Sequence, residues 1–540
     1  MSDANDNSSK IPNTWLTYDM LEYLKVHRFD GSWEEITKAF NKKFKESRTT
    51  DAVRLMFGRT IDTDLSGEEF KWWTRNAFSA TTVFTEKQAR YFVTGIMPLH
   101  TITKDGYDYT YNHVNMDAFR TLLAEQENSG QRPVILPMKA HTAPLQTSPS
   151  VYDPALTPWK DWFTAEAEFN ANIRAVDMRV NPQQMQPLTN MEKADPDSSI
   201  FIASPRQNLE IIATGNETPS RLLRSTGVLN YAGYQPNRIG RLAEKAHTLG
   251  GIVLEVDGKL FHQRRVSFDE KGGYYDLDRY VHFSGDSTSR VEMLAFGDCH
   301  FGQGNEGLHK LALSLIAKLQ PKIVLIPDGF DGLSINHHLN MIDKIARPDW
   351  AYSLETEAAV VRKHMNEMRD AAPIDCQFVW QYDNHGDFLG RYLKNRSYFN
   401  DEVNFKKAHE LQLVLLAGGN PLTTLLNLPH VKYLGPNDDL FVKGWQFANH
   451  GHMGVNGARG SRPTVGKTAN KVVQFHTHTP FEKDNHIGAG MWTNPRHGYN
   501  KGASTWLPSC VICHPDGSIQ QIIAIKKPGT KDTYVYCLED

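Results

Sequence analysis

Short apolar runs, each followed by polar residues, recur through the second half of the sequence. The runs 293–296, 323–326 and 378–380 each predict a buried strand, and Asp, Asn or His residues follow each of them. Two segments with helical periodicity, 308–319 and 356–369, lie between these runs. Strands that alternate with helices indicate an α/β sheet in which the strand ends meet along one edge.

Three further strand ends are predicted at Leu416, Phe447 and Phe475, and histidine-rich sequence follows the last two. We therefore predict an α/β domain over residues 291–540. This part is less than half of the chain but contains 15 of its 22 histidines. The excess of histidine predicts that the chemistry of the protein lies here.

The first 62 residues show a different pattern, a polar tail that we expect to be disordered and then three short helical pieces between Asp19 and Arg59. Ser32 and Glu35 form a Ser-x-x-Glu capping box at the start of the second piece. Residues 38–59 are rich in basic side chains, and the candidate nucleic-acid contacts are Lys42, Lys43, Lys45 and Arg54. The pattern resembles a helix-turn-helix module, and it equally fits a helical bundle with a solvated charged face.

Residues 63–290 carry the weakest signals. Pro, Gln and Asn cluster between Gln131 and Pro205, which predicts long loops or a linker with one strand at 134–136. Further strands are predicted at 209–213 and 251–256, followed by an alternating segment at 259–268. We expect an accessory α+β region and assign no chemistry to it.

Composition limits the class of protein. A chain of 540 residues is too long for one ordinary core, so two or three domains are expected. The formal net charge of -3 shows no overall basic bias, so any contact with nucleic acid must use a local patch. Five scattered cysteines favour a reducing compartment over a disulfide framework. With a polar N-terminus and no long apolar run, we expect a cytoplasmic protein without a signal peptide or membrane span.

The polar residues at the strand ends are metal-ligand types. Asp298 and His300 lie two residues apart, so in extended backbone their side chains project to the same side. Asp328, Asn384 with His385, His450, and His476 with His478 follow the later strands. This set offers oxygen and imidazole nitrogen without thiolate, which suits Mn, Fe or Zn rather than a structural cysteine site.

One other motif, Cys510-x-x-Cys513-His514, matches a haem attachment pattern. It lies inside an alternating, strand-like run in a chain without export signals. We therefore interpret Cys510 and Cys513 as core residues.

The ordered series Asp-x-His, Asp-x-x-Asp-Gly, Asn-His, His-Gly and His-x-His, between residues 298 and 478, is similar to that of the calcineurin-like metallophosphoesterases. The resemblance implies a two-sheet β-sandwich flanked by helices, with a two-metal site. Within this superfamily the chain resembles the SbcD-type DNA nucleases. As a whole, with its helical N-terminus, it resembles the pre-early DNases of T5-like bacteriophages.

The resemblance also implies a role for each residue of the series. Asp298, His300 and His478 would hold one divalent ion, and Asp328 would bridge to a second. Asn384, His450 and His476 would hold that second ion. His385 would stand beside both as proton donor or transition-state stabiliser. Mn is the expected metal, with Fe, Zn and Mg as alternatives.

The sequence departs from the superfamily pattern at several positions. Pro327, Asp383 and Phe475 stand where the superfamily usually has Gly. Gly386 follows His385, where an acidic residue usually orients the catalytic histidine, so Asp383 or Asp387 is expected to take that role. His452 is a further candidate for the shell of ligands.

The resemblance implies a metal-dependent DNA nuclease, an enzyme with DNA as its partner, that degrades host DNA early in phage infection. Its location would be the host cytoplasm, and homo-oligomers are compatible with the sequence. A phosphomonoesterase or protein phosphatase on the same metal core is an alternative, because Arg391 follows the Asn-His segment. A DNA-binding regulator of host takeover with a vestigial metal site is the other.

Overall fold

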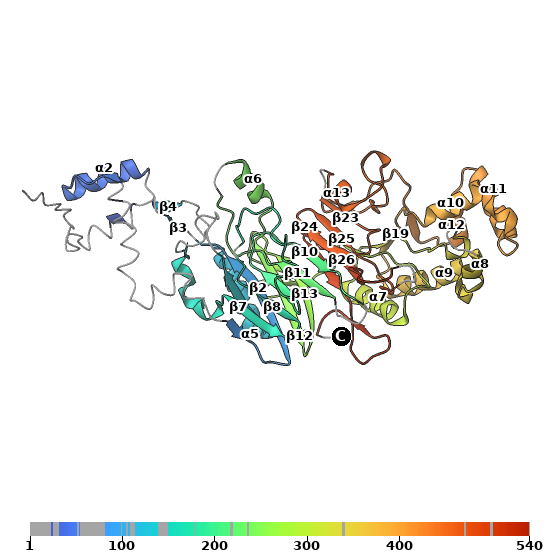
Figure 1. Cartoon of the computed structure of the whole chain (residues 1–540), viewed down its shortest axis with the longest axis horizontal. Helices are drawn as coiled ribbons and strands as arrows, with labels where there is room; N and C mark the ends of the chain where they lie inside the picture. Colours follow the sequence, from blue (N-terminus) through green and yellow to red (C-terminus); the bar gives the residue numbers. More distant parts are fainter. Residues whose placement is uncertain are drawn as a thin grey trace, which may run out of the picture.

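The computed structural model describes most of the chain from residue 81 onward and a few segments before it. The described residues are 23–24, 27, 32–50, 53, 81–98, 100–103, 106–108, 114–138, 150–178, 180–215, 220–234, 237–336, 341–468, 471–496 and 500–538. In Figure 1 the molecule is elongated, with helix α2 (Trp33–Phe44) at one end and a group of later helices at the other. The sheets lie between these two ends.

A six-stranded sheet forms the framework of the C-terminal half, in the order β20-β19-β18-β17-β26-β27. Its first four strands in this order are parallel, and β26 pairs antiparallel with both β17 and β27. Their bounds are β17 (Met293–Phe296), β18 (Ile323–Ile326), β19 (Gln377–Trp380), β20 (Val431–Tyr433), β26 (Ser509–Cys513) and β27 (Ile519–Ile523). The parallel strands therefore direct the loops that follow β17, β18 and β19 to one edge of the sheet, as predicted.

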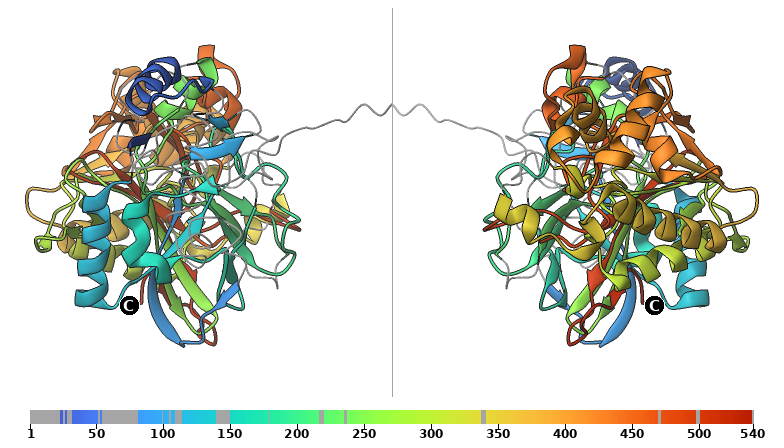
Figure 2. Two further views of the ribbon diagram at one scale, coloured as in Figure 1. Left: turned by 90° about the vertical axis from the view of Figure 1, so that its left-hand side faces the viewer. Right: turned by 90° about the vertical axis from the view of Figure 1, so that its right-hand side faces the viewer.

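Helices cover one face of this sheet. Leu294 and Phe296 point to that face and pack in one apolar cluster with Leu315 and Val361. In the right-hand view of Figure 2 the yellow and orange helices of this layer face the viewer. The helices are α7 (Glu306–Leu319), α9 (Leu354–Ala371), α10 (Gly386–Lys394), α11 (Phe405–Leu416) and α12 (Pro421–Leu426), and the short helix α8 (Met341–Ile345) precedes α9 with Ile342 and Ile345 exposed.

The other face of the six-stranded sheet packs against a second sheet. Met293 and Ala295 alternate with the residues facing the helices. They join Val473 and Ile487 of the second sheet, and Phe475 directly after one of its strands, in a separate buried cluster. This alternation is what a strand buried on both faces requires. The chain therefore has a mixed α/β fold with two sheets face to face and helices on the outside of one of them.

The second sheet has eleven strands and crosses the predicted boundary at residue 290. Strand β10 pairs with β24 through Leu209 and Glu482, so strands before and after the boundary share one sheet. Its order is β1-β7-β8-β9-β11-β10-β24-β25-β23-β22-β21. The bounds are β1 (Thr81–Val83), β7 (Glu166–Asn170), β8 (Ile173–Ala175), β9 (Ser199–Ile202), β10 (Leu209–Ile212), β11 (Arg221–Ser225), β21 (Phe441–Val442), β22 (Trp445–Gln446), β23 (Lys471–Gln474), β24 (Pro480–Lys483) and β25 (His486–Ala489).

A four-stranded sheet in the order β13-β12-β2-β5 completes the N-terminal half. Its strands are β2 (Gln88–Ile96), β5 (Arg132–Pro137), β12 (Gly250–Asp257) and β13 (Leu260–Ser267), so the strands predicted around 134–136, 251–256 and 259–268 are confirmed. One face packs on the eleven-stranded sheet through Val93, Leu254 and Phe169. Helix α5 (Met116–Ser129) packs against the other face through Phe119.

Two predictions about elements were wrong. Residues up to Leu416 form helix α11 and not a strand, because Ala408 and Leu411 are its buried positions while Leu413 and Leu416 are exposed. A short apolar run does not distinguish a helix from a strand. The segment 131–205 was expected to be loop or linker but contains the short strands β7, β8 and β9.

The N-terminal capping box is confirmed. The Ser32 side chain accepts from the backbone of Glu35, and the Glu35 side chain accepts from the backbone of Ser32, at the start of α2. Lys42 and Lys43 lie in the last turn of this helix, and Lys45 is its C-cap. Arg54 and most of the predicted first and third helical pieces lie outside the described residues.

Candidate metal centre

The loops after β17 and β18 run side by side beyond the ends of their strands. Cys299 donates its backbone N–H to the Pro327 carbonyl at 3.1 Å, and His300 donates to the Asp328 carbonyl at 2.8 Å. Asp298 is held from another direction, because Trp492 donates to its carbonyl at 2.8 Å. The backbone therefore fixes Asp298 and His300 relative to Asp328.

Four of the predicted ligands have an unusual backbone conformation. His300, Asp328, His476 and His478 have φ values of 39°, 47°, 68° and 56°. Such left-handed conformations are uncommon for residues other than glycine and cost of order 1–3 kcal/mol each. Strain of this kind persists where the surrounding structure requires a side chain in one place, which points to a functional site.

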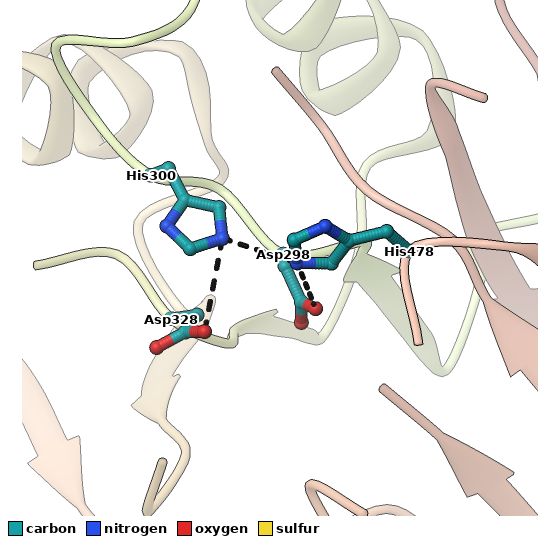
Figure 3. Close-up of side chains that lie close together, drawn as sticks. All are labelled: Asp298, His300, Asp328 and His478. Carbon is teal, nitrogen blue, oxygen red and sulfur yellow. Dashed lines mark hydrogen bonds and ion pairs between the residues drawn. The ribbon is translucent and has the colours of Figure 1, made fainter. Parts of the chain in front are cut away.

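Asp298, His300, Asp328 and His478 form a compact buried cluster (Figure 3). His478 Nε2 lies 3.1 Å from Asp298 Oδ2 and 3.2 Å from His300 Nε2. His300 Nε2 lies 3.7 Å from Asp328 Oδ2. One potential ligand atom from each residue falls within 4.8 Å of all the others, so these side chains can share one ion.

The two carboxylates of the cluster lack hydrogen-bond donors in the described part of the chain. The four oxygen atoms of Asp298 and Asp328 are all buried. Burial raises the pKa of Asp298 to about 6. Burial, together with the neighbouring carboxyls of Asp383, Asp298 and Asp331, raises the pKa of Asp328 well above its usual value. Unpaired buried carboxylates are costly, so this site calls for a counter-charge.

The histidines of the cluster do not supply that charge. Burial lowers the pKa of His300, and it lowers the pKa of His478 to about 3. Both imidazoles are therefore neutral at physiological pH and offer nitrogen lone pairs, which is the form that binds metals. Buried carboxylates beside neutral imidazoles fit a divalent cation of the kind expected from the sequence.

A second group of predicted ligands lies beside the first. His450 Nε2 is 2.8 Å from Asn384 Oδ1 and 3.6 Å from Asp328 Oδ2, and the rings of His450 and His476 are 5.2 Å apart. The same Asp328 oxygen also lies 3.7 Å from His300 Nε2. The structure thus brings all seven predicted ligands together, with Asp328 between the two groups.

His385 approaches the cluster from the N-cap of α10. Its Nδ1 lies 2.5 Å from the Asp331 carbonyl oxygen, and its Nε2 lies 3.7 Å from Asp328 Oδ2. A carbonyl oxygen only accepts, so Nδ1 carries a hydrogen and Nε2 is directed to the cluster. Asp387 accepts from the Tyr382 hydroxyl and Asp383 from the Gly386 backbone, so the group that orients His385 is Asp331.

The comparison with known proteins gives one distant relative. The chain is 27% identical over 328 residues to Protein A1 of Escherichia phage T5. The match covers 55% of this chain and 58% of Protein A1, so the chain spans less than two thirds of that relative. No protein-family model matches the chain, and no solved structure matches it. The chain is therefore a distant homologue of Protein A1.

Homology to Protein A1 assigns no role to single residues. Two residues that orient histidines of the site, Asp331 and Gln381, were not predicted from the sequence. The Asp331 side chain accepts from His300 Nδ1 at 2.9 Å. Burial alone would raise the pKa of Asp331, but the hydrogen bond from His300 and the proximity of the His300 and His385 rings lower it to about 2. Gln381 Oε1 accepts from His450 Nδ1 at 3.1 Å. Both contacts direct Nε2 of the histidine toward the other predicted ligands.

The sequence did contain a signal for Asp331, because it follows Asp328 by three residues in the same loop. Gln381 directly follows β19, three residues before Asn384, and had no comparable signal.

The remaining candidates are His452, which lies beside the metal centre, and the lysines of helix α2, which lie far from it. The ring of His452 lies 5.3 Å from that of His450, and neither of its nitrogens has a hydrogen-bond partner in the described part of the chain. Helix α2, with Lys42 and Lys43, lies at the opposite end of the molecule from β19 in Figure 1. Lys43 Nζ lies 4.3 Å from the centre of the Tyr23 ring.

Proposed function

We propose that the chain is a divalent-metal-dependent phosphodiesterase that hydrolyses DNA. The observation that carries the proposal is the pair of buried, unpaired carboxylates Asp298 and Asp328 among neutral imidazoles. In this proposal Asp298, His300 and His478 hold one ion, Asn384, His450 and His476 hold a second, and Asp328 contacts both. Mn is the expected metal. Bound divalent ions would neutralise the charge that develops on a phosphodiester during hydrolysis.

His385 is the proposed acid. Its Nδ1–H donates to the Asp331 carbonyl oxygen at 2.5 Å, which fixes the ring with Nε2 toward the cluster. When Nε2 is protonated, it can donate that proton to the oxygen that leaves phosphorus, so the leaving group departs as an alcohol rather than an alkoxide. Asp331 acts as a positioning residue for both His385 and His300.

The calcineurin-like metallophosphoesterase superfamily is the proposed family. Two sheets packed face to face, helices outside one sheet and ligands at parallel strand ends support it. The order of the ligand motifs along the sequence supports it further. Homology to a bacteriophage protein supports a role in degrading host DNA during infection, in the host cytoplasm.

A phosphomonoesterase is the second candidate, because of Arg391. The guanidinium of Arg391 lies 4.8 Å from the centre of the Phe388 ring, and that ring lies 4.8 Å from the ring of His385. Arginine near the reacting group suits a phosphomonoester dianion, which carries one more charge than a diester.

The decisive experiment incubates the purified full chain with plasmid and linear DNA in Mn²⁺, Mg²⁺ or a chelator. In parallel, it compares bis-nitrophenyl phosphate with nitrophenyl phosphate. We expect Mn²⁺-dependent cleavage of DNA and of the diester, lost in Asp328→Ala and retained in Asp516→Ala, which changes an exposed carboxylate. Faster hydrolysis of the monoester, without cleavage of DNA, would establish the phosphatase instead.

A further inference from the structure

A groove with a volume of about 740 Å³ lies between the N-terminal and C-terminal halves of the molecule. Strands β11 and β13 contribute to its wall from one half. Residues 494–496 and 504–508 and strand β28 (Ile525–Lys526) contribute from the other. The sequence predicts no chemistry for the strands on the first side.

The charge of this groove differs from that of the whole chain. Its wall carries one anion, Asp197, and four cations, which are Arg221, Lys259, Arg496 and Lys526. None of these four cations forms an ion pair within the described residues. Lys259 and Lys526 are exposed. A local excess of positive charge on a chain of formal charge -3 indicates a polyanionic ligand.

One end of the groove reaches the candidate metal centre. Trp506 lines the groove, and its ring packs edge-on against His478 with the ring centres 4.3 Å apart. The next residue, Leu507, donates its backbone N–H to the His478 carbonyl at 3.4 Å. A ligand in the groove that touches Trp506 therefore lies one side chain away from a proposed ligand of the metal.

Polar groups in the wall also lack partners. Gln263 is 5% exposed, and neither its amide oxygen nor its amide nitrogen has a hydrogen-bond partner in the described structure. The same holds for Nδ1 of His262, which is 4% exposed. Unsatisfied buried polar groups are rare and costly, and a polar ligand is one means of satisfying them.

We propose that this groove binds a single strand of DNA that leads to the metal centre. The inference rests on the proposed function and adds the form of the substrate and the surface that holds it. The four cations would contact backbone phosphates, and the half-buried indole of Trp506 would stack on a base. Stacking requires an unpaired base, so the proposed occupant is a single strand and not a duplex.

A second groove close to the centre is a poorer candidate. It has a volume of about 350 Å³ and is lined by His450 and His452, with Asp438 and Asp439 but without lysine or arginine. Its charge would repel a phosphate backbone, so the strand is assigned to the larger groove.

The test uses the full chain with the double substitution Lys259→Ala and Lys526→Ala. Both side chains are exposed and lie outside the metal centre, so folding and diester hydrolysis should not change. The matched control removes two exposed lysines away from the groove, Lys363 on α9 and Lys432 on β20, the strand at the far edge from β27. Binding of a fluorescent oligothymidylate is measured in chelator, where no hydrolysis occurs, over a range of salt concentrations.

We expect the groove variant to bind the oligothymidylate roughly tenfold more weakly, with the salt slope reduced by about 1.4, because two phosphate contacts are lost. The control variant should bind like the wild type. Equal affinity and equal slope in the groove variant and wild type, with hydrolysis of bis-nitrophenyl phosphate intact, would overturn the groove and leave the proposed function standing. If the groove variant loses more affinity for duplex DNA than for single-stranded DNA, the proposed single-strand groove would also be overturned. If the wild-type chain with Mn²⁺ does not hydrolyse bis-nitrophenyl phosphate at all, the result would instead contradict the proposed function.

Discussion

At the scale of single residues, Asp331 and Gln381 orient His300 and His450 by accepting hydrogen bonds from their Nδ1 atoms. The proximity of the Asp298 and His300 side chains was predictable because the residues lie two apart just beyond a strand, although His300 has a φ of 39° rather than extended backbone. Asp331 and Gln381 were not assigned, because their roles depend on contacts with His300 and His450 that only the fold creates. The pairing of His385 with the Asp331 carbonyl, rather than with Asp383 or Asp387, depends on the fold in the same way.

Loss of the Asp331 side chain should weaken metal binding. In Asp331→Ala the Nδ1–H of His300 loses its acceptor, so its Nε2 is no longer fixed toward Asp298 and Asp328. Such supporting contacts typically contribute 10- to 100-fold to metal affinity, and we expect a loss of about that size. Asp331→Asn keeps an acceptor oxygen and should lose less. Mn²⁺ titration by calorimetry measures both, with Asp516→Ala as the control. Equal affinity in all three variants would contradict the positioning role.

Substitution of His385 should lower turnover without removing metal. General acid catalysis contributes about 10²–10⁴-fold, so His385→Asn should slow DNA cleavage by about that factor. The deficit should shrink for a nitrophenolate leaving group, which needs no proton. Asn384→Ala should instead lose metal, and added Mn²⁺ should partly restore its activity. Loss of metal in the His385 variant would show that His385 is a ligand, and an equal deficit for all leaving groups would make its role electrostatic.

At the scale of elements, the strand that delivers a ligand was the most predictable unit. β17, β18 and β19 end at the predicted residues because each is a short apolar run buried on both faces. Helix α11 was misassigned because the short apolar run at its end, 413–416, does not distinguish a helix from a strand. Strands β7, β8 and β9 were missed because three to five residues carry little periodicity. Beyond the strand ends, backbone hydrogen bonds between neighbouring loops position the predicted ligands.

Gly297, directly after β17, lies where the backbone of one loop closely approaches the backbone of another. A Cβ there would lie 2.5 Å from the backbone Cα and N of Met491, next to the residue that bonds to Asp298. Gly297→Ala should therefore push the two segments apart, destabilise the protein by roughly 1–3 kcal/mol and weaken metal binding. Gly390→Ala is the matched control, because nothing lies within 4 Å of that Cβ and alanine favours helix α10. Denaturant unfolding and Mn²⁺ titration measure the effects. Similar behaviour of the two variants would argue against this role.

At the scale of the whole molecule, the eleven-stranded sheet makes the two halves interdependent. A sequence-based boundary at residue 290 could not reveal this, because pairing between β10 and β24 joins residues more than 250 positions apart. Where the halves meet, Glu482 lies buried between Arg224 and Arg265, at 2.9 Å and 3.2 Å. In the described part of the chain no helix is long and apolar enough to cross a membrane.

Breaking the buried ion cluster should therefore weaken the whole fold. Glu482→Gln leaves two arginines, one of them fully buried, without their carboxylate. Removing one partner of a buried pair typically costs 3–5 kcal/mol, and we expect a loss of about that size in one cooperative transition. Glu410→Gln removes an exposed partner of Lys407 and should leave the free energy of unfolding almost unchanged. Two separate transitions in Glu482→Gln, with only the first shifted, would show that the halves unfold independently.

The stability of the fold should also fall in mild acid because of buried histidines outside the metal centre. Burial lowers the pKa of His514 from 6.5 to about 4, and His514 is 1% exposed. Between these values the unfolded chain binds a proton that the folded chain does not, so this histidine's contribution is fully present above pH 6.5. It is lost as the pH falls toward 4, at about 1.4 kcal/mol per pH unit. His247 and His262 have pKa values lowered to about 4 by the same cause and add to the effect.

The measurement must isolate one histidine, because the buried carboxyls of the metal centre act in the opposite direction. Asp298 and Asp383 have pKa values raised to about 6, mainly by burial, so the metal-free folded chain takes up their protons before the unfolded chain does. Unfolding free energies of wild type and His514→Gln should therefore be compared in chelator between pH 4.5 and pH 7. We expect their difference to change by about 1.4 kcal/mol per pH unit below pH 6.5 and to level off above it. His409→Gln, on the exposed side of α11, controls for the substitution itself. A pH-independent difference for His514→Gln would mean that the folded and unfolded chains bind this proton equally well.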